Sequence, residues 1–311
     1  MPELPEVETT VRDLRPQLIG RTITRARVTW ERMVETPSAK QFTREIVGYK
    51  IVNINRRGKY LVFGLEPAVK DNPRAGRESA AEYQTNARNQ KAKIKKQKSE
   101  IGPQKFLIVH LRMTGQFGFH APRVKRDKHQ HVHLLLDDGR EMRFHDFRKF
   151  GRWWLVDNPE HVVGKLGPEP LDMTKKEFLL RLRARRGHIK PLLLNQTFVA
   201  GVGNIYADES LWYAKIHPLR DAVTITDKEA SDLYNAIRRV FRKAIGVGGT
   251  SFDATYKRIN GQSGEFQEDL RVVGRTGEPC YRCGTPIVKT VVGQRGTHYC
   301  PHCQRLEETG K

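Results

Sequence analysis

The sequence predicts an α+β, multidomain fold made of an N-terminal β-sandwich, a helical domain and a C-terminal zinc hairpin. Three observations predict it. Short β-like runs with turn signals fill residues 2–65 and 105–157, helical periodicity dominates residues 158–248, and the four cysteines all lie between residues 280 and 303. The expected domain boundaries are therefore 2–157, 158–270 and 271–306.

The first domain opens on a helix predicted over Glu6–Leu18, because apolar residues recur there at helical spacing. Strands are then expected at Thr22–Trp30, Ile51–Asn55, Tyr60–Leu65, Phe106–Leu111, His131–Leu136 and Arg152–Val156. Turn signals such as Asp137-Asp138-Gly139 separate them. A helix followed by many short strands indicates a β-sandwich or a flattened barrel.

Residues 66–104 separate two of these strands and differ from them in composition. Tyr83 is the only aromatic residue in the segment, and Arg88–Lys98 holds six basic residues and no acidic one. We interpret the segment as an insertion in a hairpin loop, helical or disordered. A solvated surface loop and a basic arm that contacts a polyanion both fit such a charge run.

The middle of the chain is predicted to be helical. Thr174 is a candidate N-cap for Lys175–Arg186, and Glu177 completes the capping-box pattern. Three further helices are expected at Ile189–Gln196, Asn204–Ile216 and Asp227–Ile245, the last of them ended by Gly246 and Gly248-Gly249. Residues 249–279 are Gly-rich and polar, which is typical of a mobile loop.

The cysteines form the pattern C-x2-C-x16-C-x2-C, with ligand candidates Cys280, Cys283, Cys300 and Cys303. Four thiolates at this spacing are typical of one tetrahedral structural zinc ion, and a pair of disulfides is the alternative. His298 and His302 are not expected to be zinc ligands, because four cysteines are available. The segments Pro286–Val292 and Thr297–Tyr299 flank residues 293–296 and predict a β-hairpin between the two cysteine pairs.

Charge indicates the kind of partner. The 56 Lys and Arg residues outnumber the 35 Asp and Glu residues, giving a net charge of +21. Such an excess predicts a polyanionic partner, either nucleic acid or an anionic membrane. No window approaches the roughly 20 apolar residues of a membrane span. The acidic start MPELPEVET is unlike a secretion signal. We therefore expect an intracellular protein that contacts nucleic acid.

The N-terminus carries the candidate chemistry. Removal of Met1 would leave Pro2 with a free secondary amine, which can attack a sugar C1′ or an aldehyde and form a Schiff base. Glu3 is placed to act as a general acid, and Glu6 to lie nearby across the first helical turn. These residues also have an ordinary interpretation, since a Glu near a helix N-terminus often only matches the helix dipole.

A set of motifs occurs in one order along the chain. They are MPELPEVET at the start, RRGKYL at 56–61, HLRMTG at 110–115, DFRKFG at 146–151, VAGVGNIYADESLW at 199–212, and GQRGTHYCPHCQ in the zinc hairpin. In this the sequence resembles the formamidopyrimidine-DNA glycosylase (MutM/Fpg) family of bacterial base-excision repair. The resemblance covers nearly the whole chain outside 66–104. It implies a β-sandwich, a helix–two-turn–helix domain and a zinc hairpin, with DNA held in the cleft between them.

The resemblance also implies an activity. Pro2 matches the nucleophile, Glu3 the acid/base residue, and Glu6 and Glu209 the carboxylates that order the proline and its surroundings. The expected enzyme is a bifunctional DNA glycosylase and AP lyase that works through a Schiff base and β,δ-elimination. Leu4-Pro5-Glu6 points to the branch of the family that removes oxidised purines, namely 8-oxoguanine opposite cytosine and formamidopyrimidines.

Six positions match DNA-binding residues of the family. Lys59, Asn204 and Arg295 correspond to residues that hold the phosphates flanking the lesion; an ammonium, a helix N-terminus and a guanidinium are good phosphate donors. Met113, Arg148 and Phe150 correspond to the wedge that fills the space of the extruded base. Taken singly, Met113 and Phe150 would more often be core residues, but their polar neighbours favour exposure.

The sequence departs from the family in the insertion 66–104 and in Ser251–Glu265, the stretch that covers the flipped base in the family. Three other functions are therefore weighed. One is an endonuclease VIII-like glycosylase for oxidised pyrimidines, one a non-catalytic protein that binds lesion DNA, and one a zinc-ribbon protein of RNA or ribosomes. The expected partner is double-stranded DNA with oxidised bases, bound by a monomer in the bacterial cytoplasm, at the nucleoid.

Overall fold

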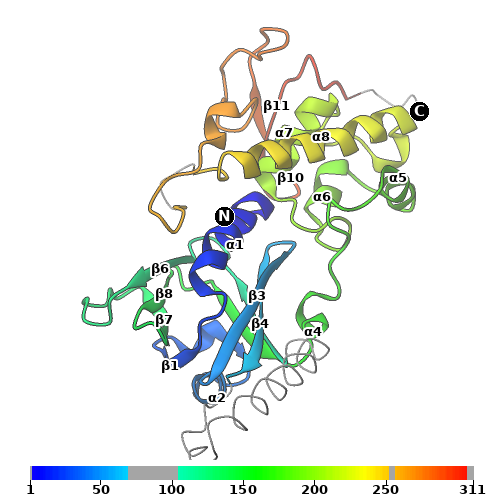
Figure 1. The fold of residues 1–311 in the computed structure, drawn as a ribbon. Helices are drawn as coiled ribbons and strands as arrows, with labels where there is room; N and C mark the ends of the chain where they lie inside the picture. Colours follow the sequence, from blue (N-terminus) through cyan, green and yellow to red (C-terminus); the bar gives the residue numbers. More distant parts are fainter. Residues whose placement is uncertain (1, 69–103, 252–255, 307–311) are drawn as a thin grey trace, which may run out of the picture.

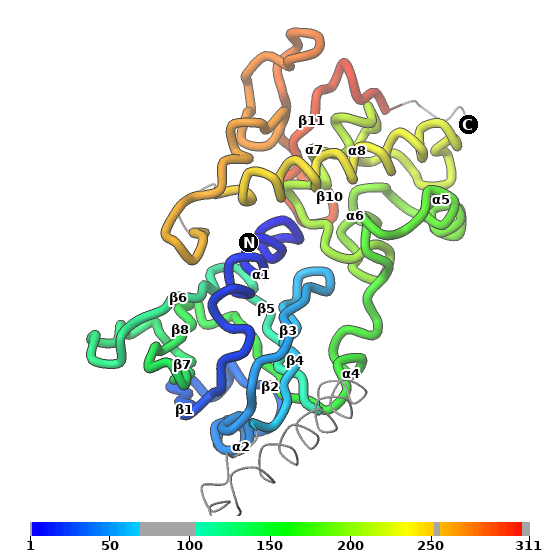
Figure 2. The backbone as a smooth tube through the Cα atoms, in the orientation of Figure 1, coloured from blue at the N-terminus to red at the C-terminus, as the bar shows by residue number. Residues whose placement is uncertain are grey.

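The structure is a computed structural model, and it describes residues 2–68, 104–251 and 256–306. The expected insertion at 66–104 therefore lies almost wholly outside the described residues, as do four positions of Ser251–Glu265. Two groups of elements are visible in Figure 1, a β-rich N-terminal half and a helical half that carries the β10–β11 hairpin. The smooth trace in Figure 2 shows α1 between the two halves.

The N-terminal half is a β-sandwich, as predicted. One sheet has the order β1 (Ile23–Val28), β7 (Gln130–Leu136), β8 (Glu141–His145), β6 (Gln116–His120). The other has the order β2 (Val34–Thr36), β9 (Arg152–Val156), β5 (Lys105–His110), β4 (Tyr60–Pro67), β3 (Tyr49–Arg57). All named pairs are antiparallel except β2 with β9. The core between the sheets holds Phe63, Phe117, Phe144 and Trp153, whose rings meet edge to face.

Helix α1 (Leu4–Leu18) covers this core and reaches the second half of the molecule. Its predicted apolar stripe of Val7, Val11, Leu14 and Leu18 is completely buried in the N-terminal core. Leu4, one turn earlier, belongs instead to the core of the helical half. The helix begins two residues before the predicted start, because Pro5 is favourable in the first turn of a helix.

The helical half contains α4 (Glu160–Val163), α5 (Lys175–Arg183), α6 (Ile189–Leu194), α7 (Asn204–Ala214) and α8 (Asp227–Gly246). Short 3₁₀ turns lie at Ala222–Thr224 and Phe266–Asp269. Thr174 caps α5 as predicted, since its hydroxyl accepts the N–H of Glu177 at 3.2 Å. Within the described parts of the chain, no helix has the length and apolar character needed to cross a membrane.

The C-terminal hairpin pairs β10 (Val288–Val292) with β11 (Arg295–Tyr299). Gly293 and Gln294 form the turn with φ values of 55° and 61°. A type I′ hairpin turn requires positive φ values at both of its central residues. Arg295 is consequently the first residue after the turn, at the tip of the hairpin, as predicted.

Several elements were not predicted. These are the 3₁₀ turn at Glu31–Met33, β2, α2 (Ala39–Glu45), β6 and β8. Three predicted helices also end earlier than expected, at Arg183, Leu194 and Ala214. The α7 helix ends early because Lys215 adopts a left-handed conformation with φ of 60° and closes the helix C-terminus.

Candidate active site and zinc module

Glu3 lies at the N-terminus of α7, although it is 202 positions from Ile205 of that helix in sequence. Its Oε1 atom accepts the backbone N–H of Ile205 at 3.0 Å. Gly203, the residue before α7, permits this approach, since a Cβ atom there would lie 2.2 Å from the Glu3 carboxyl carbon. Free N–H groups at a helix start favour a carboxylate. The other oxygen of Glu3 is buried and has no hydrogen-bond partner in the described residues, so it is available to a bound molecule.

Burial governs the protonation of Glu3. The pKa of this carboxyl is raised to about 7, mainly by burial; Lys59 and the Ile205 N–H oppose the rise, and the neighbouring Glu6 adds to it. A carboxyl group with a pKa near neutrality can give and take a proton at physiological pH. Glu3 therefore has the property expected of a general acid.

Glu6 holds the N-terminal backbone in place. Its Oε2 atom accepts the N–H of Glu3 at 2.8 Å. Its Oε1 atom accepts the N–H of Thr250 at 2.8 Å and the hydroxyl of Tyr206 at 2.5 Å. Pro2, which precedes Glu3, is buried. The start of the chain is thus fixed against α7 and the segment after α8.

Lys59 follows Gly58 in the β3–β4 turn, and only 6% of its surface is exposed. Burial lowers the pKa of its ammonium group, Glu3 and Glu6 oppose that shift, and Arg295 adds to it. Lys59 has no ion pair or hydrogen bond through its side chain within the described ranges. A buried ammonium group without a direct partner is costly, so its position is suited to an anion that comes from outside.

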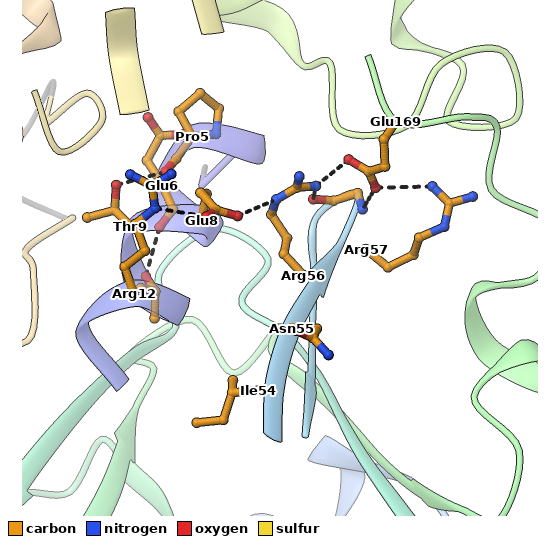
Figure 3. Close-up of polar contacts among 12 residues, drawn as sticks. Pro5, Glu6, Glu8, Thr9, Arg12, Ile54, Asn55, Arg56, Arg57 and Glu169 are labelled. Carbon is orange, nitrogen blue, oxygen red and sulfur yellow. Dashed lines mark hydrogen bonds and ion pairs between the residues drawn. The ribbon is translucent and has the colours of Figure 1, made fainter. Parts of the chain in front are cut away.

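The turn that carries Lys59 is fixed by Glu169, a residue that the sequence analysis missed. Figure 3 shows the Glu169 carboxylate between Arg56 and Arg57. It accepts hydrogen bonds from Arg56 at 2.5 Å, from Arg57 at 3.1 Å and from the backbone N–H of Gly58 at 2.6 Å. Glu169 belongs to the segment between α4 and α5, so the helical half itself positions the Lys59 turn.

Asn204 and Arg295 are linked through the hairpin. The side-chain amide of Asn204 donates to the carbonyl of Gly296 at 3.0 Å, and the Arg295 side chain beside it is exposed. Arg295 and Lys59 are close enough to affect each other electrostatically. The three residues predicted to bind phosphate therefore come from three separate elements and lie around one region.

A buried ion pair fixes the same hairpin strand. Lys190 and Asp208 are both fully buried, with 2.6 Å between the Lys190 Nζ and Asp208 Oδ1 atoms. Lys190 also donates to the Thr297 hydroxyl at 2.7 Å, and Asp208 accepts the N–H of His298 at 2.9 Å. A buried pair is stable only when its remaining donors and acceptors are satisfied, and the backbone of β11 supplies several of them.

The wedge candidates lie on two neighbouring loops. Met113 is half-buried in the loop after β5, and 43% of the Phe150 surface is exposed in the loop after β8. The Arg148 guanidinium lies over the Phe150 ring, 4.9 Å from its centre. None of the three belongs to either apolar core, which agrees with the expected exposure.

Asp146, a fully buried residue that was not predicted, joins these two loops. Its carboxylate accepts the Thr114 hydroxyl on one oxygen and the N–H of Gly151, at 2.7 Å, on the other. The Phe144 ring packs between Gly115 and Gly151 so closely that a Cβ atom on either would lie 2.4 Å or 2.7 Å from it. The Asp146 carboxylate and the Phe144 ring therefore contact both loops and fix them relative to each other.

Glu209 lies apart from the proline. Its carboxylate accepts the backbone N–H groups of Arg271, Val272 and Val273 at 2.9 to 3.0 Å. Burial raises its pKa to about 7, although these three N–H groups oppose the rise. In the described structure no contact joins Glu209 to Pro2, and it holds the segment that leads into the zinc module.

The four cysteines come together as predicted. Their sulfur atoms all lie within 4.8 Å of one another, and no histidine belongs to the cluster. The cysteines are free thiols, so the alternative of two disulfides is wrong. The indole N–H of Trp212 lies 3.4 Å from the Cys280 sulfur, and such a bond favours a thiolate. This donor set fits one structural zinc ion.

Comparisons with known proteins agree with this geometry. Family models match three stretches of the chain: the formamidopyrimidine-DNA glycosylase N-terminal domain at residues 1–153, the formamidopyrimidine-DNA glycosylase H2TH domain at 166–255, and a zinc finger found in FPG and IleRS at 277–306. The formamidopyrimidine-DNA glycosylase of Herpetosiphon aurantiacus is 45% identical over 98% of this chain and its own whole length. That of Enterococcus faecalis is 41% identical over 99% of this chain and 98% of its own.

Solved structures give the same result. A structure of MutM in complex with DNA containing carbocyclic 8-oxo-G matches with a TM-score of 0.80 and 36% identity, over 98% of this chain and all of that one. A Lactococcus lactis Fpg variant with Fapy-dG-containing DNA matches with a TM-score of 0.81 and 37% identity, with the same coverage. A complex of Lactococcus lactis Fpg with abasic-site DNA has a TM-score of 0.80 at 37% identity.

Proposed function

The chain belongs to the formamidopyrimidine-DNA glycosylase family, and we propose that Pro2, Glu3 and Lys59 carry out the family's reaction in it. The protein is a DNA glycosylase with AP lyase activity that removes oxidised purines from duplex DNA. The observation that best supports the residue roles is Glu3, a buried carboxyl with a pKa of about 7 and one unpartnered oxygen.

The first step is base removal. The amine of Pro2 attacks C1′ of the damaged nucleotide, the bond between C1′ and the base nitrogen breaks, and the departing base takes up the proton that the Pro2 nitrogen loses. The bond between C1′ and the ring oxygen then breaks to give an iminium ion, and protonated Glu3 donates a proton to that ring oxygen. Glu6 orients both residues, because its carboxylate accepts the N–H of Glu3 directly. The product is a Schiff base between the enzyme and the sugar.

Strand cleavage follows from the Schiff base. The iminium group acidifies the C2′ proton, whose loss expels the 3′ phosphate; a second elimination then expels the 5′ phosphate. Deprotonated Glu3 is placed to accept the C2′ proton. Lys59, Asn204 and Arg295 hold the flanking phosphates during these steps, which agrees with the unpaired ammonium of Lys59 and the exposed guanidinium of Arg295.

The remaining residues prepare the substrate. Met113, Phe150 and Arg148 fill the space that the extruded base leaves and contact the orphaned partner base. Zinc, when bound to the four cysteines, supplies folding energy to the C-terminal hairpin and takes no part in the chemistry. Glu209 contributes indirectly by fixing the segment at 271–273.

The proposal also covers the domain boundaries, the oligomeric state and the cellular location of the protein. The units are 2–157 for the β-sandwich with its catalytic N-terminus, 158–270 for the helix–two-turn–helix domain, and 271–306 for the zinc finger. The protein acts as a monomer in the bacterial cytoplasm, associated with the nucleoid while it is on DNA. Its net charge of +21 supports this association.

Borohydride trapping tests the proposal. The enzyme is incubated with an 8-oxoguanine:cytosine duplex and, separately, with a dihydrouracil duplex. We expect a covalent adduct that maps to residue 2 and forms mainly on the first duplex. An adduct mainly on the second would assign the chain to the oxidised-pyrimidine branch. No adduct from protein that has lost Met1 would favour a non-catalytic DNA binder.

A further inference from the structure

The loop between β6 and β7 borders a groove lined mainly by positive charge. The groove measures about 440 Å³ and lies between residues 122–130 and the edge of β1. Four cations that line it, Arg27, Arg123, Lys125 and Lys128, are exposed. None of them has an ion pair or a hydrogen bond through its side chain in the part of the chain that the structure describes.

The groove contains little compensating negative charge. Asp127 is its one acidic lining residue, and the N–H of His129 lowers the pKa of its carboxyl, so it is ionised. The remaining cation, Arg126, is already paired with Glu141 at 2.7 Å. Burial lowers the pKa of His133, which is therefore neutral at pH 7. Positive charge remains in clear excess.

The loop is ordered from beneath by a buried arginine. Only 1% of the Arg143 surface is exposed, and its guanidinium donates to the Val124 carbonyl at 2.8 Å and to the carbonyls of Ala121 and Lys125 at 3.4 Å. Its charge is balanced by Glu141 at 2.6 Å. These bonds fix the backbone from which the exposed cations of the loop project.

The groove borders the loop after β8, which carries the wedge candidates Arg148 and Phe150. The carbonyl of His129 accepts the N–H of Asp146 at 2.8 Å, and the His129 ring packs edge-on against Phe147, 6.4 Å between ring centres. Phe147 directly precedes Arg148. On the other side, β1 leads to Trp30, whose ring lies 4.2 Å from the ammonium of Lys149. The cations therefore lie on the same continuous surface as the residues that meet the lesion.

We propose that this groove binds the sugar–phosphate backbone of duplex DNA beyond the phosphates assigned to Lys59, Asn204 and Arg295. It extends the interface along one arm of the duplex. Exposed, unpaired cations on a fixed backbone are the arrangement that releases counterions from a regular polyanion. The inference rests on the proposed binding of lesion DNA at the active site, and it concerns affinity and placement rather than chemistry.

The test removes the three unpaired cations of the loop together, as Arg123→Ser, Lys125→Ser and Lys128→Ser, and leaves the paired Arg126 in place. Binding to a long duplex with a central tetrahydrofuran site is followed by fluorescence anisotropy across a range of KCl concentrations. We expect the slope of log affinity against log salt to fall by about 2 to 3, near 0.9 for each phosphate that the variant no longer neutralises. Single-turnover excision of 8-oxoguanine at saturating enzyme should stay at the wild-type rate.

A matched control removes three exposed cations elsewhere, as Lys40→Ser on α2 with Lys175→Ser and Lys176→Ser on α5. This variant has the same net charge as the test variant but keeps the groove. An unchanged slope in the test variant, or an equal decrease in the control, would overturn the proposal. Wild-type protein that fails to bind or excise the lesion would instead overturn the proposed function, so the two failures are distinguishable.

Discussion

The hydroxyl of Thr114 donates a hydrogen bond to the carboxylate of Asp146, and this bond crosses between the loops that carry Met113 and Phe150. Asp146 is fully buried and also accepts the N–H of Gly151 at 2.7 Å. The two loops that carry the proposed wedge side chains are thus joined through one buried carboxylate.

Replacing Thr114 with Val should uncouple the loops. The change keeps the shape of the side chain but leaves a buried carboxylate oxygen without its donor, which costs about 1–3 kcal/mol. We expect slower base extrusion, measured with a 2-aminopurine reporter beside the lesion, and near-normal lyase activity on a preformed abasic site. Thr114→Ser should restore extrusion. Wild-type extrusion in the Val variant would show that the bond has no positioning role.

Retention of Met1 should abolish excision. The nitrogen of Pro2 would then be an amide, which is not nucleophilic, whereas the phosphate-binding residues would be unchanged. Protein with Met1 blocked, verified by mass, is compared with mature protein for borohydride adduct and for affinity to tetrahydrofuran DNA. Pro2→Gly should likewise lose excision and keep binding. If the blocked protein still excises the base, Pro2 is not the nucleophile.

The pH dependence should follow Glu3. Because its pKa of about 7 lies above the usual value of 4.5, the acid form persists to neutrality and is lost as pH rises further. We expect kcat/KM for excision to fall about tenfold per unit above that pKa, since this ratio reports the free enzyme. Glu3→Gln should lower the rate by roughly 10²–10⁴ and flatten this limb. If kcat/KM of Glu3→Gln still falls in the same way above pH 7, another group is responsible for that decrease.

Gly203→Ala should displace Glu3. The added methyl group would lie 2.2 Å from the Glu3 carboxyl carbon, so either this carboxyl or the start of α7 must move. A shift of about 1 Å at a catalytic group can cost about 10²-fold in rate. Gly246→Ala is the control, because a Cβ atom there meets nothing within 4 Å. Equal rates in the two variants would show that Glu3 needs no precise placement.

Zinc removal should weaken DNA binding before it affects the β-sandwich. Without metal the segment around the four cysteines loses its main source of stability, and Arg295 loses its fixed position. A chelator should reduce affinity for tetrahydrofuran DNA and change the fluorescence of Trp212, whose indole lies 3.4 Å from Cys280. Added zinc should reverse both effects. Unchanged affinity in metal-free protein would argue against a role for Arg295.

The elements predicted from the sequence are those with a clear periodic pattern, such as α1, α8 and most strands of the sandwich. The missed strand β8 shows why others escape prediction. Glu141 and Arg143 in this strand are both buried, and they neutralise each other at 2.6 Å. Glu141 and Arg143 do alternate with apolar residues, but over only five residues this is a weak strand signal, and the pairing that allows both to be buried becomes visible only after folding.

The residues of the site also fall into two groups, those that the sequence identifies and those that it does not. Pro2, Glu3, Lys59 and the zinc cysteines stand in recognisable motifs, so they could be named in advance. Asp146, Glu169 and Lys190 could not be, because each acts through partners that the fold brings close. Glu169, for example, binds Arg56 across 113 positions of sequence. Nothing in the local sequence distinguishes such a residue from an ordinary surface charge.

The contacts of α7 limit how this protein can evolve. Along a single helix of 11 residues, Ile205 holds Glu3, Asp208 holds the hairpin, Glu209 holds the segment before the zinc module, and Trp212 contacts a zinc ligand. Successive residues of an α-helix are rotated by about 100° around the helix axis. One insertion or deletion within α7 would therefore rotate some of these contacts away from the others, so natural variants should differ here by substitution and not by length.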